Sequence, residues 1–118
     1  MKLFGIPNCD TVKKARAWLE NHRVAYEFHD LKKEPALRPL LQGWIRQGGW
    51  EMLLNRQGIT WRNLDDAVKA ALTNQAAALA LMLEKPTVIK RPLLELDGKL
   101  RCIGYDEAVY TQLFKAKK

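Results

Sequence analysis

The sequence contains few cysteines, no long apolar run and no repeated or low-complexity segment. Only two of the 118 residues are cysteine, so no disulfide framework exists, and we expect reduced thiols rather than a Cys9–Cys102 bridge. The two histidines do not lie at zinc-ligand spacing from either cysteine, so no metal site is expected. No apolar run reaches the roughly 18 residues that span a bilayer, and glycine and proline interrupt MKLFGIPN too early for a signal peptide. We therefore expect a cytoplasmic protein.

The charge of the chain is positive but dispersed. The formal net charge of +7 is compatible with a nucleic-acid ligand, an anionic small substrate or a solvated basic surface. The chain has no helix-turn-helix, zinc-finger or RNA-binding signature, so we expect no direct nucleic-acid binding and no membrane association. With 47% hydrophobic and 28% charged residues, the composition is that of one globular domain spanning residues 1–118.

The first 31 residues have the pattern of a strand, a helix and a second strand. Residues 2–5 form a short strand that ends at a Gly-x-Pro break, and residues 25–31 alternate as a strand does. Between them, an apolar stripe at helical spacing predicts a helix from Asp10 to Asn21-His22. The stripe consists of Val12, Ala15, Trp18 and Leu19. This βαβ order predicts parallel strands with a right-handed crossover.

Residues 35–85 predict a helical insertion. An apolar stripe from Leu37 to Ile45 predicts a first helix that stops at Gly48-Gly49. The segments WEMLLNRQG, DDAVKAAL and NQAAALALMLEKP predict further helices, the last one capped by Thr73 or Asn74.

The last third of the chain predicts two strands and a helix. PLLEL and KLRCIG are joined by Asp97-Gly98, which is typical of a type I′ hairpin turn with positive φ at both residues. DEAVYTQLF predicts a closing helix with Asp106 as its cap; its predicted inward residues are Ala108, Val109 and Leu113. The order βαβ, helical insertion, ββα predicts an α/β fold with a thioredoxin-like four-stranded mixed sheet.

Cys9 lies in IPNCDTVKK, where the first strand gives way to the first helix. Unpaired backbone N–H groups and the helix dipole at a helix N-terminus lower a thiol's pKa and make it nucleophilic. The Thr11 hydroxyl and the Lys13 ammonium can both act at this first turn. A cysteine that only packs is the other interpretation, and position alone leaves both open. No second cysteine follows in the loop, so a reactive Cys9 needs an external resolving thiol.

The pair Arg91-Pro92 favours the reactive interpretation. It stands at the start of the third predicted strand, where thioredoxin-like domains carry a proline, commonly in the cis form, beside the reactive cysteine. The Arg91 guanidinium would then face an anion in the site. A proline at an edge-strand start and a surface arginine are the ordinary alternatives.

The segments GIPNCDTVKKA, WEMLLNRQG, IKRPLLELDGK and IGY together resemble the arsenate reductase (ArsC) family, and more closely its YffB-like branch, a relative of the Spx regulators. The resemblance runs from Lys2 to Phe114 and implies that Cys9 is the catalytic nucleophile. The substrate-binding residues that it implies are Asn8, Thr11, Lys13, Arg56, Arg91 and Pro92.

Three positions depart from the pattern of the arsenate reductases. The family has oxyanion-binding arginines at two positions that are Asn55 and Ile103 in this sequence, and Arg56 lies next to the first of them. The family also has a histidine at the position of Gly5. We expect such a site to bind arsenate poorly. The resemblance instead implies a thiol/disulfide oxidoreductase with no bound cofactor, with glutathione as co-substrate and glutaredoxin as a candidate partner. The alternatives are a Spx-like adapter that binds RNA polymerase without chemistry and a true arsenate reductase.

Overall fold

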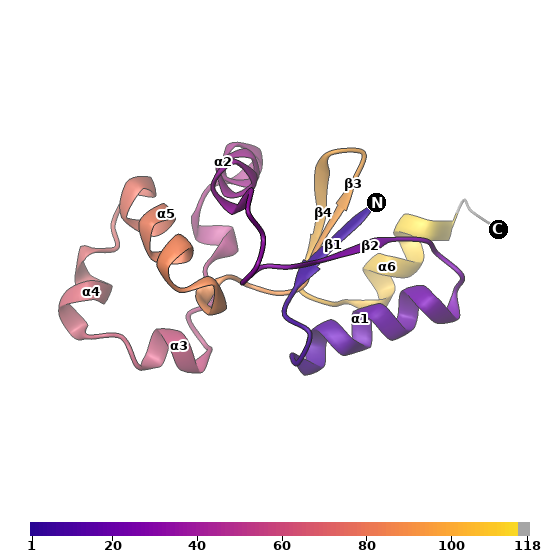
Figure 1. Cartoon of the computed structure of the whole chain (residues 1–118), viewed down its shortest axis with the longest axis horizontal. Helices are drawn as coiled ribbons and strands as arrows, with labels where there is room; N and C mark the ends of the chain where they lie inside the picture. Colours follow the sequence, from indigo (N-terminus) through magenta and orange to yellow (C-terminus); the bar gives the residue numbers. More distant parts are fainter. Residues whose placement is uncertain (116–118) are drawn as a thin grey trace. The chain divides into compact units, whose positions relative to one another are not determined.

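The computed structural model describes residues 1–115, and the chain divides into two compact units. The first unit contains Met1–Asp30 and the chain from Arg91 onward, and the second unit is Leu31–Lys90. The first unit carries the β-sheet. The second unit, called the helical unit below, consists of short helices and connecting loops (Figure 1).

The sheet has four strands in the order β2-β1-β3-β4. β1 (Lys2–Gly5) pairs in parallel with β2 (Glu27–Asp30), and α1 (Asp10–Asn21) makes the crossover between them. β3 (Leu93–Leu96) lies antiparallel to β1 on its other side and also pairs antiparallel with β4 (Lys99–Ile103). The predicted parallel pair, antiparallel hairpin and four-stranded mixed sheet are confirmed, and the fold is a thioredoxin-like α/β fold.

The turn between β3 and β4 has the predicted backbone. Asp97 has φ +52° and Gly98 has φ +77°, so both central residues are left-handed. Glycine adopts this region without penalty, and a short polar residue such as aspartate tolerates it better than most. The Asp-Gly pair therefore fixes the register of the hairpin.

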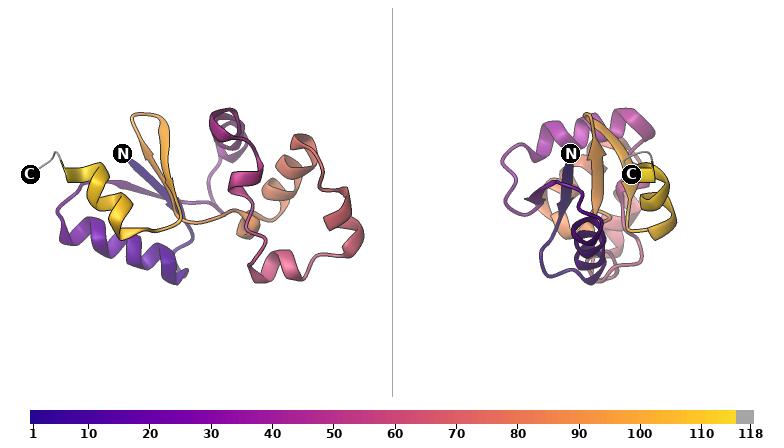
Figure 2. Two further views of the ribbon diagram at one scale, coloured as in Figure 1. Left: turned by 180° about the vertical axis from the view of Figure 1, so that it is seen from behind. Right: turned by 90° about the vertical axis from the view of Figure 1, so that its right-hand side faces the viewer.

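α1 and α6 (Glu107–Phe114) cover the same face of the sheet and lie side by side (Figure 2). α1 buries the predicted stripe of four residues. The two helices and the sheet share one apolar cluster, which consists of Leu3, Ala15, Trp18, Leu19, Leu94, Cys102, Tyr110 and Phe114. Within it the ring of Trp18 meets the Tyr110 ring edge-on, with the centroids 5.5 Å apart.

The predicted inward face of α6 is wrong. Ala108 and Val109 are exposed and Leu113 is half-buried, whereas Tyr110 and Phe114 are buried. These two aromatic side chains are four residues apart and so lie on one side of the helix. They bury more apolar area against the sheet than the smaller side chains would, and this decides which side faces inward. Asp106 caps the helix as predicted, since its Oδ1 accepts a 2.9 Å hydrogen bond from the backbone N–H of Ala108.

The helical unit contains four α-helices and two 3₁₀ turns within its described residues. They are α2 (Leu37–Gly48), η1 (Glu51–Leu53), α3 (Ile59–Arg62), α4 (Asp66–Ala71), α5 (Gln75–Glu84) and η2 (Pro86–Val88). Asn74 caps α5 through a 2.9 Å hydrogen bond from the N–H of Ala77. The helix predicted in WEMLLNRQG is only the turn η1, because Leu54 then pairs with Ile89 as an isolated antiparallel bridge. No helix among residues 1–115 is long and apolar enough to cross a membrane.

Candidate functional site

Cys9 is the residue at which the chain turns from β1 into α1. It is the N-cap of α1, half-buried, with the extended backbone angles φ −88° and ψ 127°. Its N–H donates to the carbonyl of Ile6 at 3.1 Å and closes a tight turn, while its carbonyl accepts from the N–H of Lys13 at 2.9 Å and opens the helix. Hydrogen bonds on both sides therefore hold the Cys9 backbone in place.

The surroundings of the Cys9 sulfur favour the thiolate. Burial by itself raises the pKa of this thiol. Hydrogen bonds from the Val12 N–H, the Arg91 guanidinium and the Thr11 N–H, with the positive charge of Arg91, together outweigh burial and hold the pKa of Cys9 below its ordinary value. At neutral pH, Cys9 is therefore ionised to a greater extent than a free cysteine, and the thiolate is the nucleophilic form.

Arg91 reaches Cys9 because of the strand pairing. β3 runs antiparallel to β1 with Leu93 opposite Phe4, so the residues before Leu93 lie at the end of β1 from which the Cys9 loop departs. The Arg91–Pro92 peptide bond is cis, as the family resemblance predicts. Pro92 is buried, and its carbonyl accepts a 2.8 Å hydrogen bond from the Gly104 N–H. The sheet thus brings the predicted Arg91-Pro92 pair to the cysteine loop.

The three other predicted residues near Cys9 are exposed: Asn8 in the loop, and Thr11 and Lys13 at the start of α1. Thr11 acts on the sulfur through its backbone N–H, and Lys13 is not among the groups that lower the pKa of Cys9. Their side chains are accessible to a bound molecule, and their substrate-binding roles stay predictions.

Close packing against Val12 explains why residue 5 is a glycine. A Cβ atom there would lie 2.8 Å from Cγ2 and 3.1 Å from Cγ1 of Val12, which is completely buried. No histidine can therefore stand at position 5 while Val12 keeps its place. Sequence reasoning identified the missing histidine but not its reason, and it missed Val12 as a residue of the site. The only available signal was a glycine that immediately precedes the cysteine loop.

Cys102 is separated from Cys9 by the sheet geometry. It lies on β4 opposite Leu94, which in turn lies opposite Leu3, so β3 stands between its strand and β1. Two strand spacings amount to roughly 10 Å, beyond the Cα separation of about 7 Å that a disulfide can bridge. The Cys102 Sγ donates to the Gly104 carbonyl at 3.3 Å, and burial, with the negative charge of Asp106, raises its pKa. Both cysteines are free thiols, and Cys102 is a packing residue.

Arg56 belongs to the helical unit and lies in the loop before α3. Its guanidinium stands over the Trp61 ring at 5.5 Å, and it lines a hollow of about 340 Å³ together with Lys90. Asn55 is built into the loop: its Oδ1 accepts from the Gln57 N–H at 3.0 Å, and its own N–H donates to the Val88 carbonyl at 2.8 Å. Asn55 therefore stabilises the conformation of the loop, and the exposed Arg56 gives the loop a positive charge.

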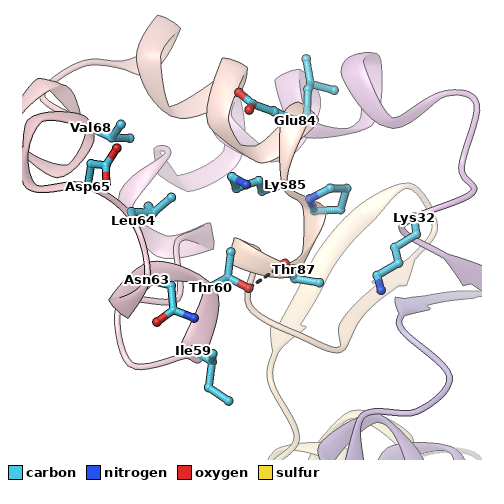
Figure 3. A pocket seen from close by; sticks show the side chains of 12 residues that line it. Lys32, Ile59, Thr60, Asn63, Leu64, Asp65, Val68, Glu84, Lys85 and Thr87 are labelled. Atoms are coloured by element: carbon cyan, nitrogen blue, oxygen red, sulfur yellow. Dashed lines mark hydrogen bonds between the residues drawn. The ribbon is translucent and has the colours of Figure 1, made fainter.

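A larger hollow of about 860 Å³ lies elsewhere in the helical unit, among α3, α4, α5 and η2 (Figure 3). The hydroxyls of Thr60 and Thr87 share a 2.7 Å hydrogen bond in its wall. Its charged lining residues are balanced in sign: Lys32, Asp65, Glu84 and Lys85. None of the predicted site residues lines this hollow, and its lining favours neither an anion nor a cation. Within residues 1–115, no three His, Cys, Asp or Glu side chains are placed to hold a metal ion.

Comparison with known proteins shows the family to which this chain belongs. The ArsC family profile matches residues 4–113. A solved structure of a YffB protein is 48% identical, covers 94% of this chain and 96% of its own, and superposes with a TM-score of 0.85. An arsenate reductase (ArsC)-related protein from Brucella melitensis is 46% identical over 97% of this chain and 93% of its own, with a TM-score of 0.77. The global transcriptional regulator Spx of Streptococcus agalactiae is 32% identical over 89% of this chain and 76% of its own. The chain belongs to the ArsC family.

Proposed function

We propose that this protein is a glutathione-dependent thiol/disulfide oxidoreductase with Cys9 as its single redox-active thiol. The observation that supports this most directly is the lowered pKa of Cys9, which follows from the first turn of α1 and from Arg91. Disulfide exchange proceeds by attack of a thiolate, so a site that stabilises a thiolate at neutral pH is suited to it.

The proposed reaction takes two exchange steps. The Cys9 thiolate attacks the glutathione sulfur of a mixed disulfide, forms a Cys9–glutathione disulfide and expels the substrate thiolate, which takes a proton from water. A second glutathione thiolate then attacks the glutathione sulfur of that adduct. It forms oxidised glutathione and expels the Cys9 thiolate. Together, the two steps consume one free glutathione and convert the mixed disulfide into the free substrate thiol and oxidised glutathione. Because a low-pKa thiolate is a good leaving group, the groups that activate Cys9 in the first step also assist the second.

The resolving thiol in this scheme comes from outside the chain. Cys102 lies two strands away in the sheet and is held in the apolar cluster, so glutathione or a glutaredoxin has to supply it. The carboxylates of glutathione suit cationic partners, and we assign them to Arg91 and Lys13 of the first unit. Arg56, which belongs to the helical unit, stays a substrate contact that the family resemblance implies. Asn8, Thr11 and Pro92 complete the proposed binding surface. The reaction needs no bound cofactor, and it needs a reduced glutathione pool such as the cytoplasm provides.

The test is a glutathione exchange assay on three proteins: wild type, Cys9→Ser and, as the matched control, Cys102→Ser. Wild type and Cys102→Ser should reduce a glutathionylated peptide, and Cys9→Ser should not. Mass spectrometry after incubation with oxidised glutathione should find one adduct, located on Cys9. A Cys9→Ser protein that retains the activity would falsify the proposal.

The relationship to Spx supports a second candidate, an adapter that binds RNA polymerase. A pull-down with the polymerase separates the two, because an adapter should bind with Cys9 replaced by serine, whereas the oxidoreductase should not bind at all. Arsenate reduction is the weaker candidate, since an aliphatic side chain at Ile103 and a glycine at Gly5 occupy positions where arsenate reductases carry polar groups. An assay with arsenate, glutathione and glutaredoxin should therefore show no turnover.

A further inference from the structure

Gly5 and Val12 form the closest contact between the end of β1 and the start of α1. Gly5 is the last residue of β1 and is buried, and Val12 has no exposed surface. A Cβ atom on residue 5 would lie 2.8 Å from Val12 Cγ2, a distance that Cβ atoms essentially never show. The first turn of α1 can lie this close to the strand only because residue 5 has no side chain.

The backbone of Gly5 does not itself require a glycine. Among the described residues, the glycines with positive φ are Gly49, Gly98 and Gly104, and Gly5 is a regular residue of the strand. Its pairing with Asp30 in the parallel ladder is one that any residue can make. Glycine is therefore required at position 5 for steric reasons, because the Val12 side chain occupies the space that a Cβ atom would need.

We propose that Gly5 is a positioning residue for Cys9: the absence of a Cβ atom at position 5 lets the first turn of α1 lie directly against β1, and this aims the N–H groups of Thr11 and Val12 at the Cys9 sulfur. The inference rests on the proposed function, because it concerns how the Cys9 thiolate is formed. It goes beyond that function by adding a residue that touches neither the sulfur nor the substrate.

Val12 transmits the effect because it is stiff and confined. A β-branched residue in a helix has one strongly preferred rotamer, and a completely buried side chain has no free space into which to turn. A methyl group at position 5 must therefore displace the helix backbone rather than rotate the side chain. The Val12 N–H moves with that backbone, and hydrogen bonds weaken steeply when distance and angle depart from their optimum. Arg91 belongs to a different segment, so its contribution to Cys9 stays in place.

The experiment measures the alkylation of Cys9 by iodoacetamide as a function of pH, with mass spectrometry to follow Cys9 separately from Cys102. The variants are Gly5→Ala, Val12→Ala and the double variant, in which the new methyl group fills the space that Val12 vacates. Gly98→Ala is the control, because its φ of +77° makes it a strained substitution in the same unit, at the tip of the hairpin. Circular dichroism establishes that each variant is folded.

Gly5→Ala should move the midpoint of the pH profile upward and slow alkylation at pH 6 by roughly three- to tenfold, as loosening hydrogen bonds to a charged sulfur should. The plateau at high pH should not fall, because a thiolate of higher pKa is intrinsically more nucleophilic. Gly98→Ala should keep the wild-type midpoint, and the double variant should have the same midpoint as Val12→Ala, because the methyl group on residue 5 then meets no side chain. A folded Gly5→Ala with an unmoved midpoint, or a double variant whose midpoint lies above that of Val12→Ala, overturns the positioning role.

Two further outcomes are also decisive. If Gly5→Ala does not fold, the comparison of the double variant with Val12→Ala carries the test: equal midpoints support the inference, and a higher midpoint in the double variant overturns it. If the wild-type midpoint already lies at the value of an ordinary thiol, the proposed function fails. A lowered wild-type midpoint that Gly5→Ala leaves unchanged removes only the role of Gly5.

Discussion

Arg91 offers a direct test of what activates Cys9. Its guanidinium both hydrogen-bonds to the sulfur and acts on it through its charge. A hydrogen bond to a charged group is worth about 1.5–3 kcal/mol when it is desolvated, but Cys9 is only half-buried, so about 1 kcal/mol is the appropriate figure. Arg91→Ala should therefore slow the alkylation of Cys9 at pH 6 by roughly fivefold. Arg91→Lys keeps the charge but loses the planar fork, and its rate should lie between those of wild type and Arg91→Ala.

The assay is the alkylation rate between pH 5 and 10 at low and at high salt. The contribution of Arg91 should shrink in high salt, because partly exposed charges are screened, whereas the part due to backbone N–H groups should persist. Arg101→Ala is the matched control, since it removes an exposed arginine of β4 that does not act on Cys9. If Arg91→Ala leaves the profile unchanged, or if Arg101→Ala shifts it equally, the assignment of Arg91 to the thiolate is wrong.

Two further predictions concern stability. The pKa of Cys9 is lower in the folded protein than in the unfolded chain, so at pH values between these two pKa values the unfolded chain binds more protons. The free energy of unfolding should therefore rise with pH across this range. The contribution of Cys9 to stability is lost as the pH falls through the folded-state pKa. Urea unfolding between pH 5 and 9 should show this slope in wild type relative to Cys9→Ser, and equal slopes would contradict it. Tyr110→Phe should raise the free energy of unfolding by about 1 kcal/mol, because the buried Tyr110 hydroxyl has no hydrogen-bond partner among the described residues. A loss of stability of that size in a thermal melt would mean that the hydroxyl is hydrogen-bonded after all.

The sequence predicted α1 and the β3–β4 hairpin well because the patterns that specify them are local in the chain. The stripe of α1 appears as a 3.6-residue period in the chain, and its four members are all buried. The Asp97-Gly98 turn is specified by two residues whose backbone preferences select the hairpin. Cys9 and Arg91-Pro92 could be named because each stands at a recognisable boundary between elements.

The errors arose where tertiary contacts outweigh local pattern. α6 turns Tyr110 and Phe114 inward because the Trp18 ring lies opposite them, and no periodicity within the eight residues of the helix reveals that neighbour. The segment after Leu53 leaves helical geometry because Leu54 pairs with Ile89, far along the chain. α3 was not predicted, because four residues are too few to show a helical period.

By itself, the sequence determined the order of the elements, the placement of a lone cysteine at a helix N-terminus and the absence of a resolving thiol beside it. Only the tertiary structure decided what acts on that cysteine. Antiparallel pairing of β3 with β1 brings Arg91 to the Cys9 loop, and the close approach that Gly5 permits sets the N–H groups of Thr11 and Val12 against the sulfur. Backbone N–H groups are the same in every residue except proline, so no side-chain pattern records where they point. Their direction is set by packing, and in this way packing lowers the pKa of Cys9.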